Sequence, residues 1–266
     1  MAKKKALKKV QSRTKVVVAE ESVSDDTIIW RYFKFERFLR ILSKHELWFS
    51  RPSAFDDKWE GLFPPSYVRG SRQYAKAHKI PFKEFDQEFR RRELRHRHGH
   101  FVNCWHISSH ESDAMWRLYG LAGSGIAIQS TVGDFKECLR PHNSGKVIYY
   151  DPSNDIVSKS IFGPHDILFK REDFTWEQEY RFWFDDDDLL QKIEAGKKFQ
   201  TGRLSKGMAR TISDLQRFIE KIVVAPGASD EFISVVRSAC GEYHKNWLRS
   251  TVERSYSDRM WDSFKK

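Results

Sequence analysis

The stretch TIIWRYFKFERFLRILSKHELWFS, residues 27–50, predicts a strand, a helix and a second strand in direct succession. Its first part, TIIWRYF (27–33), is rich in the β-branched and aromatic side chains that favour strands. In FERFLRILSKHE (35–46), apolar side chains recur at the three- and four-residue spacing of an amphipathic helix. LWFS (47–50) is again typical of a strand, and Arg51-Pro52 ends it.

The rest of the chain mixes short strands with helices and lacks the regular alternation of a parallel doubly wound sheet. We therefore predict an α+β fold with small mixed or antiparallel sheets. A flexible basic arm is expected over 1–24, and a single domain over 25–266 with a polar helical insertion at about 66–98. Further predicted elements are strands at 101–108, 125–130, 146–151 and 177–184, a short helix at 112–120 with Ser112 as its N-cap, and a closing unit of strand 221–227, helix 229–240 and strand 249–254.

Composition and charge indicate a globular protein with polyanionic partners. The chain has 266 residues, of which 39% are hydrophobic and 14% aromatic, enough to bury a core. Its formal net charge is +10 and its pI about 9.4. Such a balance favours nucleic acid or phosphate-bearing ligands through long-range attraction.

The cysteines and the apolar runs indicate a reducing, cytoplasmic location. Cys104, Cys138 and Cys240 are odd in number and widely spaced, so neither a disulfide framework nor a cysteine zinc site is expected. No run reaches the about 18 apolar residues that a membrane span needs, and no signal-peptide pattern follows the basic start.

The segment FTWEQEYRFWF, residues 174–184, carries carboxylates inside an aromatic run. On a strand, Trp176, Gln178, Tyr180, Phe182 and Phe184 would share a core face. The other face would then hold a second set of side chains: Glu177, Glu179, Arg181 and Trp183. That second face is either an ion-pair ladder or the floor of a site, and the pattern alone leaves both interpretations open.

Several chemical motifs are absent or fail. No phosphate-binding glycine loop and no G-x-S-x-G elbow occurs. The run RHRHGH (95–100) interleaves histidine with arginine, so cations oppose a metal there. We interpret it as part of a basic surface helix that would contact phosphates through its arginines, Arg90, Arg91, Arg92, Arg95 and Arg97. Cys104, two residues before His106, is expected to be a buried structural cysteine.

Four segments carry a resemblance to a known family: WRYFKFERFLRILSKHELWFSRPSAFDD (30–57), MWRLYG (115–120), GIAI (125–128) and WEQEYR (176–181). Together they resemble the bacterial domain-of-unknown-function 2971 family, over roughly residues 29 to 255. That family's usual pattern begins Y-R-Y and continues L-W-F-S-x-P-x-x-F-N-D, M-W-x-x-Y and W-x-x-E-x-E-W-R. This chain departs from it with Asp56 in place of Asn, Tyr180 in place of Trp, and Tyr32-Phe33 offset against Y-R-Y. The resemblance implies an effector of abortive-infection or phage-defence systems, with an antitoxin or another defence protein as its partner.

The strand-helix-strand opening is also similar to the start of ADP-ribosyltransferase folds, which implies NAD as the cofactor. On this resemblance Glu179 would be the catalytic glutamate and Glu177 would assist it. The cofactor would be bound by Arg31, Tyr32, Ser50, Trp116 and Tyr119. For the two aromatic residues Trp116 and Tyr119, stacking on nicotinamide or a base competes with ordinary core packing.

Two other functions stay open. One is a metal-dependent nuclease that uses Asp57, Glu177 and Glu179, although the D/E-x-K pattern fails because Arg181 stands where Lys is needed. The other is a non-enzymatic nucleic-acid-binding module that uses the arm 1–15 and the helix 90–98. The leading prediction expects no metal.

Overall fold

The structure is a computed structural model, and it describes residues 16–17, 23–63, 65–119, 123–153, 156–157 and 166–265. The predicted basic arm, residues 1–24, lies outside this range except for 16–17 and 23–24. Within the described chain no helix is long and apolar enough to cross a membrane.

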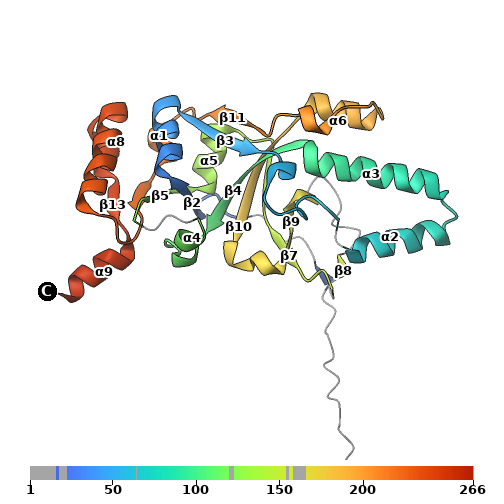
Figure 1. The fold of residues 1–266 in the computed structure, drawn as a ribbon, viewed down its shortest axis with the longest axis horizontal. Helices are drawn as coiled ribbons and strands as arrows, with labels where there is room; N and C mark the ends of the chain where they lie inside the picture. Colours follow the sequence, from blue (N-terminus) through green and yellow to red (C-terminus); the bar gives the residue numbers. More distant parts are fainter. Residues whose placement is uncertain are drawn as a thin grey trace, which may run out of the picture.

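The main sheet has nine strands, so it is larger than the small sheets predicted, while the α+β class is confirmed (Figure 1). Its strand order is β11-β3-β4-β2-β5-β12-β13, with β10 pairing on β4 and β6 pairing on β10. All its pairings are antiparallel except that of β12 with β13. The strands are β2 (Ile28–Lys34), β3 (Glu46–Ser50), β4 (His100–Ile107), β5 (Gly125–Thr131), β6 (Asn143–Lys146), β10 (Glu179–Asp185), β11 (Gly207–Thr211), β12 (Lys221–Val224) and β13 (Val252–Arg254).

Two small parallel pairs lie beside the main sheet. β1 (Val16–Val17) pairs with β8 (Ile156–Val157), and β7 (Ile148–Tyr150) pairs with β9 (Phe169–Arg171). The strand predicted at 146–151 is therefore divided between β6, which ends at Lys146, and β7.

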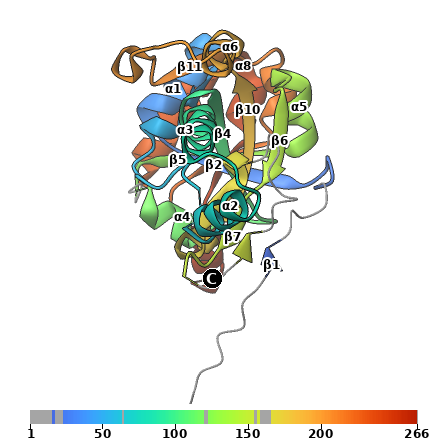
Figure 2. The same cartoon turned by 90° about the vertical axis from the view of Figure 1, so that its right-hand side faces the viewer.

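Helices cover the sheet and extend beyond it (Figure 1). The described α-helices are α1 (Phe35–Lys44), α2 (Pro65–Ala77), α3 (Phe82–His98), α4 (Asp113–Leu118), α5 (Val132–Leu139), α6 (Asp187–Glu194), α7 (Leu215–Phe218), α8 (Asp230–Ser250) and α9 (Tyr256–Phe264). Figures 1 and 2 show α2 and α3, the helices expected over 66–98, projecting together at one end of the molecule. The Ser112 hydroxyl accepts a hydrogen bond from the Met115 amide, which confirms the predicted N-cap of α4.

The core lies between the sheet and helices α1, α5 and α8. The rings of Phe135 and Phe182 stack at 3.6 Å, and Trp105 meets Phe135 edge-on at 5.6 Å. Both predicted β-α-β units are confirmed. β2, α1 and β3 open the domain, and β12, α8 and β13 close it, with α8 running to Ser250 rather than Cys240.

The predicted strand 177–184 was wrong at its start, and β10 begins at Glu179. Residues Glu172–Glu177 form a 3-10 helix, and Gln178 has a positive φ of 39° that turns the chain into the strand. Trp176 is therefore 38% exposed and not part of the core face. From Glu179 on, the two predicted faces hold, because Tyr180, Phe182 and Phe184 enter the main core.

The sheet divides at β4, because β2 and β3 share one edge of this strand, and we call this division the fork. The candidate site lies there. One edge of β4 pairs with β10 along seven residues, from His100↔Asp185 to His106↔Glu179. Its other edge is shared, because β2 pairs only near His106 and β3 pairs only at Val102. The residues 103–105 between these two pairings face an opening in the sheet.

Candidate active site

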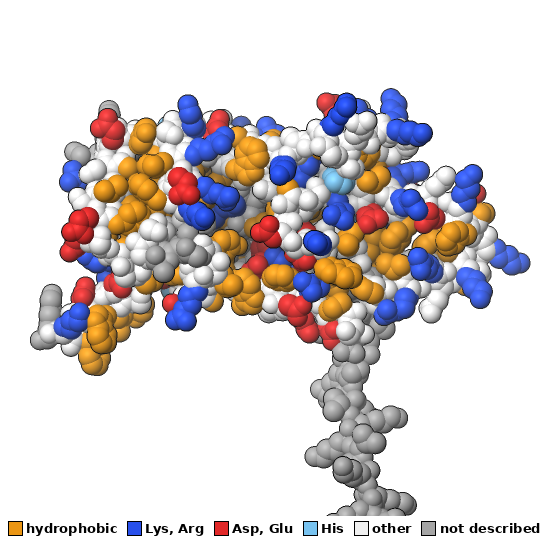
Figure 3. Space-filling view, viewed as in Figure 1, with side chains coloured by type: hydrophobic (Ala, Val, Ile, Leu, Met, Phe, Trp, Pro, Cys, Tyr) orange, Lys and Arg blue, Asp and Glu red, His pale blue; other side chains and the backbone are white. Residues whose placement is uncertain are grey.

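A cleft of about 370 Å³ occupies this fork. Figure 3 shows a hollow near the middle of this face, with acidic side chains at one edge and Lys and Arg side chains at the other. Its walls come from β2, β3, β4, α1, α4 and the start of β10. Six of the seven predicted catalytic and cofactor-binding residues line it: Arg31, Tyr32, Ser50, Tyr119, Glu177 and Glu179.

Arg31 lies at the centre of the fork and bridges β2 to β4. Its Nη1 donates to the carbonyl of Cys104 at 3.0 Å and to the side-chain oxygen of Asn103. Asn103 is fully buried and is fixed by two further bonds, to the carbonyl of Trp48 at 2.7 Å and from the indole of Trp105 at 2.7 Å. Within the described chain, Nε and Nη2 of Arg31 have no recorded hydrogen-bond partner, so they are available to a ligand.

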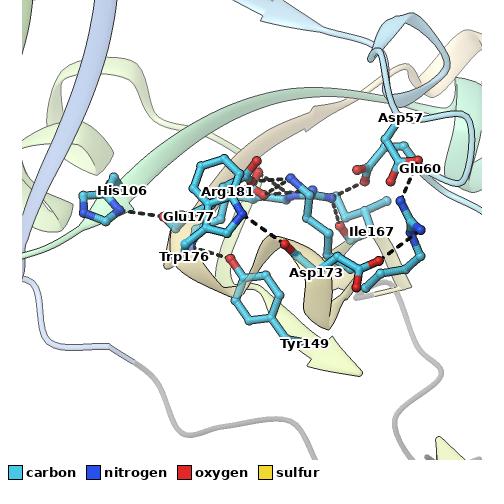
Figure 4. Close-up of polar contacts among 12 residues, drawn as sticks. Asp57, Glu60, His106, Tyr149, Ile167, Asp173, Trp176, Glu177 and Arg181 are labelled. Carbon is cyan, nitrogen blue, oxygen red and sulfur yellow. Dashed lines mark hydrogen bonds and ion pairs between the residues drawn. The ribbon is translucent and has the colours of Figure 1, made fainter. Parts of the chain in front are cut away.

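The opposite end of the cleft holds two carboxylates that share one lysine. Lys170 of β9 donates to Glu177 and, at 3.0 Å, to Glu179. Arg181, two residues along β10, binds both oxygens of Glu179, at 2.8 and 3.1 Å. Figure 4 shows this group beside the 3-10 helix that carries Asp173 and Trp176. Glu179 is thus held in one orientation by two cations.

Arg181 is fully buried and connects the cleft to a second carboxylate. Its Nη1 donates to Glu60 at 2.6 Å and to the carbonyl of Ile167. We call the five charged residues Glu60, Lys170, Glu177, Glu179 and Arg181 the buried charge cluster. It contains three carboxylates and two cations, so it carries a net charge of −1 when all are ionised. One carboxylate in the cluster is therefore easier to protonate than the others.

That carboxylate is Glu177. Burial raises its pKa to about 7; Lys170 opposes this shift and Glu179 adds to it. Burial would also raise the pKa of Glu179, but Arg181 and Lys170 outweigh it and hold that pKa well below its ordinary value. Near neutral pH, Glu179 is a fixed negative charge and Glu177 exchanges a proton.

Three residues of β4, Cys104, Trp105 and His106, line the cleft and were not predicted as site residues. His106 donates from Nδ1 to the carbonyl of Glu177 at 2.6 Å, and burial lowers its pKa, so the neutral ring orients the turn before β10. Cys104 lies opposite Arg181 in the register, and burial raises the pKa of its thiol. Cys104 packs against the apolar cluster that contains Val102 and Trp183, as a structural cysteine would, and it also lines the cleft.

Trp116 is the one predicted cofactor-binding residue that does not line the cleft. Its side chain is 2% exposed and packs edge-on against Tyr32 at 4.8 Å. Its indole donates to Glu111 at 2.8 Å, so both its ring and its polar atom are used in the core. Tyr32 is also buried, and its hydroxyl accepts from the Ser112 amide at 2.7 Å. Tyr119, in contrast, is 48% exposed at the cleft.

The predicted nucleic-acid-binding arginines lie on α3, away from the cleft. Four of them already have carboxylate partners on the surface: Arg90 with Asp86, Arg91 and Arg92 with Glu88, and Arg95 with Glu194. Arg97 is partly buried, and its Nε is a buried atom without a recorded partner in the described chain. Of the nearby histidines, His96 packs on Phe63 and His100 binds Asp185, so both are buried rather than on a basic surface.

The carboxylates of the nuclease alternative are each paired with a cation. Asp57 lies 3.6 Å from Arg171, while Glu177 and Glu179 share Lys170. Among the described residues, no group of three or more His, Cys, Asp or Glu side chains is arranged to hold a metal ion.

Comparison with known proteins gives a family resemblance over part of the chain and no function. No curated protein and no solved structure matches the chain. The model of a family described as Protein of unknown function (DUF2971) matches residues 115–182, the segment from α4 to β10 that contains Tyr119, Glu177 and Glu179. This match bears out the predicted resemblance to the domain-of-unknown-function 2971 family over these residues.

Proposed function

We propose that this protein is an enzyme that binds NAD in the forked cleft and transfers its ADP-ribosyl group to nucleic acid. The observation that carries the proposal is the convergence of Arg31, Ser50, Glu177 and Glu179 on one cleft. These residues come from β2, β3, the 3-10 helix and β10, so Arg31 and Ser50 meet the two glutamates from more than a hundred residues away in the sequence. Perturbed carboxylates in a cleft beside an arginine are typical of a catalytic site.

The residues present suit a dinucleotide with a phosphate at one end and a reacting sugar at the other. The guanidinium of Arg31 has unused donors, and planar guanidinium groups bind phosphate oxygens. The carboxylates of Glu177 and Glu179 face the same cleft and accept hydrogen bonds from sugar hydroxyls. A volume of about 370 Å³ falls in the range of ligand pockets, roughly 300–1,000 Å³.

The chemistry divides between the two glutamates. NAD supplies a nicotinamide–ribose bond whose cleavage releases nicotinamide with the bonding electrons and leaves positive charge on the ribose, as in glycoside hydrolysis. Glu179, kept ionised by Arg181 and Lys170, stabilises that charge. Glu177, with its pKa raised to about 7, takes the proton from the acceptor atom as that atom bonds to the ribose. The sequence suggested Glu179 as the main catalytic residue with Glu177 assisting, and the raised pKa of Glu177 supports a role for it in the proton transfer.

The proposed nucleic-acid acceptor rests on the net charge of the chain, and the proposed role in bacterial defence rests on the family resemblance. A net charge of +10 supports a polyanionic acceptor such as DNA or RNA. The three cysteines are unpaired, which supports a cytoplasmic location. The family resemblance supports a role as a toxic effector in bacterial defence, with a partner that restrains it.

The direct test is incubation of the full chain with NAD labelled in its ADP-ribosyl part, together with DNA, RNA or cell extract. We expect label on one nucleic acid and release of nicotinamide. Glu177→Gln should reduce transfer at least about 100-fold, since general-base catalysis contributes about 10²–10⁴. Glu88→Gln on α3 is the matched control and should keep full activity.

The alternatives give different results in the same assay. Absence of both label transfer and NAD loss, in a protein that is folded and toxic to cells, would contradict the proposal. Nucleic-acid cleavage that stops with EDTA and needs no NAD would support the nuclease. Binding that is insensitive to Glu177→Gln, but is weakened when Arg90, Arg91 and Arg92 are neutralised, would support a binding module.

A further inference from the structure

The cleft has a second end, opposite the carboxylates, to which the proposed function gives no role. It is formed by Arg37 and Arg40 of α1 and by Trp48 of β3, and all three line the same cleft as Arg31. Arg37 and Arg40 lie three residues apart on α1 and are exposed, whereas Phe38, Ile41 and Leu42 of the same helix are buried. They therefore extend over the rim of the cleft instead of packing into the core.

This end of the cleft carries an excess of positive charge. Arg40 pairs with Glu46 at 3.2 Å, but among the described residues neither Arg31 nor Arg37 has a carboxylate within ion-pair distance. The bonds of Arg31 go to the neutral groups Asn103 and Cys104. Three guanidiniums against one carboxylate leave a net charge of +2, which favours an anionic ligand. Guanidinium groups recognise phosphate through paired hydrogen bonds.

Trp48 provides a flat apolar surface beside these cations. It is 43% exposed, because on β3 the side chains of Glu46, Trp48 and Ser50 alternate with the buried Leu47 and Phe49. Its indole is supported from β11, since a Cβ at Gly207 would lie only 2.7 Å from the indole atoms Cε2 and Cζ2.

The other neighbour of the indole is movable. The guanidinium of Arg40 lies 5.8 Å from the ring centroid, near the outer limit of about 6 Å for a cation–π contact. Arg40 is also exposed and held by a single ion pair. A planar base can therefore displace it from the ring.

We propose that this end of the cleft binds a nucleoside diphosphate, with Arg31, Arg37 and Arg40 on the phosphates and the base stacked on Trp48. Base–aromatic stacking supplies the affinity that exposed arginines alone lack. The inference rests on the proposed function in that the bound group would be the adenosine diphosphate half of NAD. The enclosed carboxylate end then receives the reacting ribose, while the base lies on the open rim.

Titration calorimetry with ADP tests the subsite without any reaction, because ADP contains no nicotinamide–ribose bond. We expect saturable binding of ADP, weakened about 10-fold or more by Trp48→Ala and less than about threefold by Trp48→Phe. Arg37→Gln and Arg40→Gln should each weaken it several-fold and reduce its dependence on salt. Trp59→Ala and Arg90→Gln are the matched controls, because both side chains are exposed and neither lines the cleft.

Two results would overturn the subsite. The first is absence of ADP binding to the folded wild type. The second is ADP binding that matches inorganic pyrophosphate and is unchanged in Trp48→Ala and Trp48→Phe. The outcome is separable from that of the proposed function. A protein that binds ADP through Trp48 but leaves NAD intact keeps the subsite and loses the transfer reaction. A protein that consumes NAD with the same KM in Trp48→Ala keeps the reaction and loses the subsite.

Discussion

The buried charge cluster below the cleft and the ion pairs along α3 use the same residue types in opposite environments. In the buried charge cluster, the side chain of Arg181 is fully buried and binds two carboxylates and a carbonyl. On α3, the side chain of Arg90 is 75% exposed and binds one carboxylate four residues away. Removing one member of the buried charge cluster leaves its partners as unpaired buried charges. The charges of an exposed pair on α3 are instead solvated by water and screened by salt when the partner is removed.

The difference in burial explains the shifted titration of Glu177. Removal from water makes each charge in the buried cluster depend on its neighbours, and the mismatch of three carboxylates with two cations raises the pKa of Glu177. The arginines of α3 keep much of their water, so each of their ion pairs contributes little to stability. Burial, more than the number of ion pairs, separates the candidate site from the surface.

The largest expected effect follows from Arg181→Met. It would leave Glu60 and Glu179 buried without their main cation, and breaking such a pair costs about 3–5 kcal/mol of the free energy of unfolding. Chemical denaturation measures the loss, with Arg90→Met as the surface control. A loss below about 1 kcal/mol would show that the cluster is solvated and that the contrast with α3 is wrong.

A smaller effect is expected in the pH dependence of stability. Because the pKa of Glu177 is about 7 when folded and ordinarily 4.5, the folded protein holds a proton between these values that the unfolded chain releases. The stability due to Glu177 is therefore complete below about pH 4.5 and is lost as the pH rises to about 7. Glu177→Gln should remove a decline on the order of 1–2 kcal/mol between pH 5 and pH 8, measured by denaturation of both proteins. Parallel pH profiles for the two proteins would contradict this assignment.

The smallest effect is expected on α3. Arg90→Ala removes one exposed i,i+4 pair, and such pairs contribute about 0.3–0.5 kcal/mol. The melting temperature should change by no more than a degree or two, and less at high salt, where the pair is already screened. A loss comparable to that of Arg181→Met would mean that the helix pair is stabilised through its charges and not through packing.

The sequence predicted elements well where local pattern and burial agree. The strand at Ile28–Lys34, the helix after it and the Ser112 cap were all recognisable, because side-chain periodicity and capping act over a few residues. The alternating pattern of 174–184 led to a wrong prediction at its start. The aromatic residues continue to alternate through a 3-10 helix, and nothing in the sequence indicates the positive φ of Gln178 at which the strand begins. The helix α6, whose N-cap is the Asp186 carboxylate, was not predicted. Leu189 and Ile193, four residues apart and buried on that helix, were the available signal.

Residues at both ends of the cleft could be predicted from the sequence, but the ion pairs that hold the carboxylates in place could not. Arg31 and Glu179 were identified from residue type and resemblance. Lys170 and Glu60 were missed because Lys170 lies on β9, outside the main sheet, and Glu60 lies in a turn 121 residues before its partner Arg181. Trp116 was misassigned for a similar reason, since helical spacing does not tell which of two neighbouring aromatic residues faces a cavity. Arg37 and Arg40 were not predicted as site residues, because arginines on the exposed side of an amphipathic helix are typical of an ordinary surface.

Because the cleft needs β10 to be paired with β4, it can form only late in the synthesis of the chain. Arg31, on β2, leaves the ribosome long before Glu179, and β4 has no partner along its far edge until β10 has been made. Contacts this distant in sequence form late, and the strands that await them remain exposed until then. A nascent chain therefore carries the basic half of the cleft without its carboxylates, and any activity of the site begins only after residue 185 has joined the sheet.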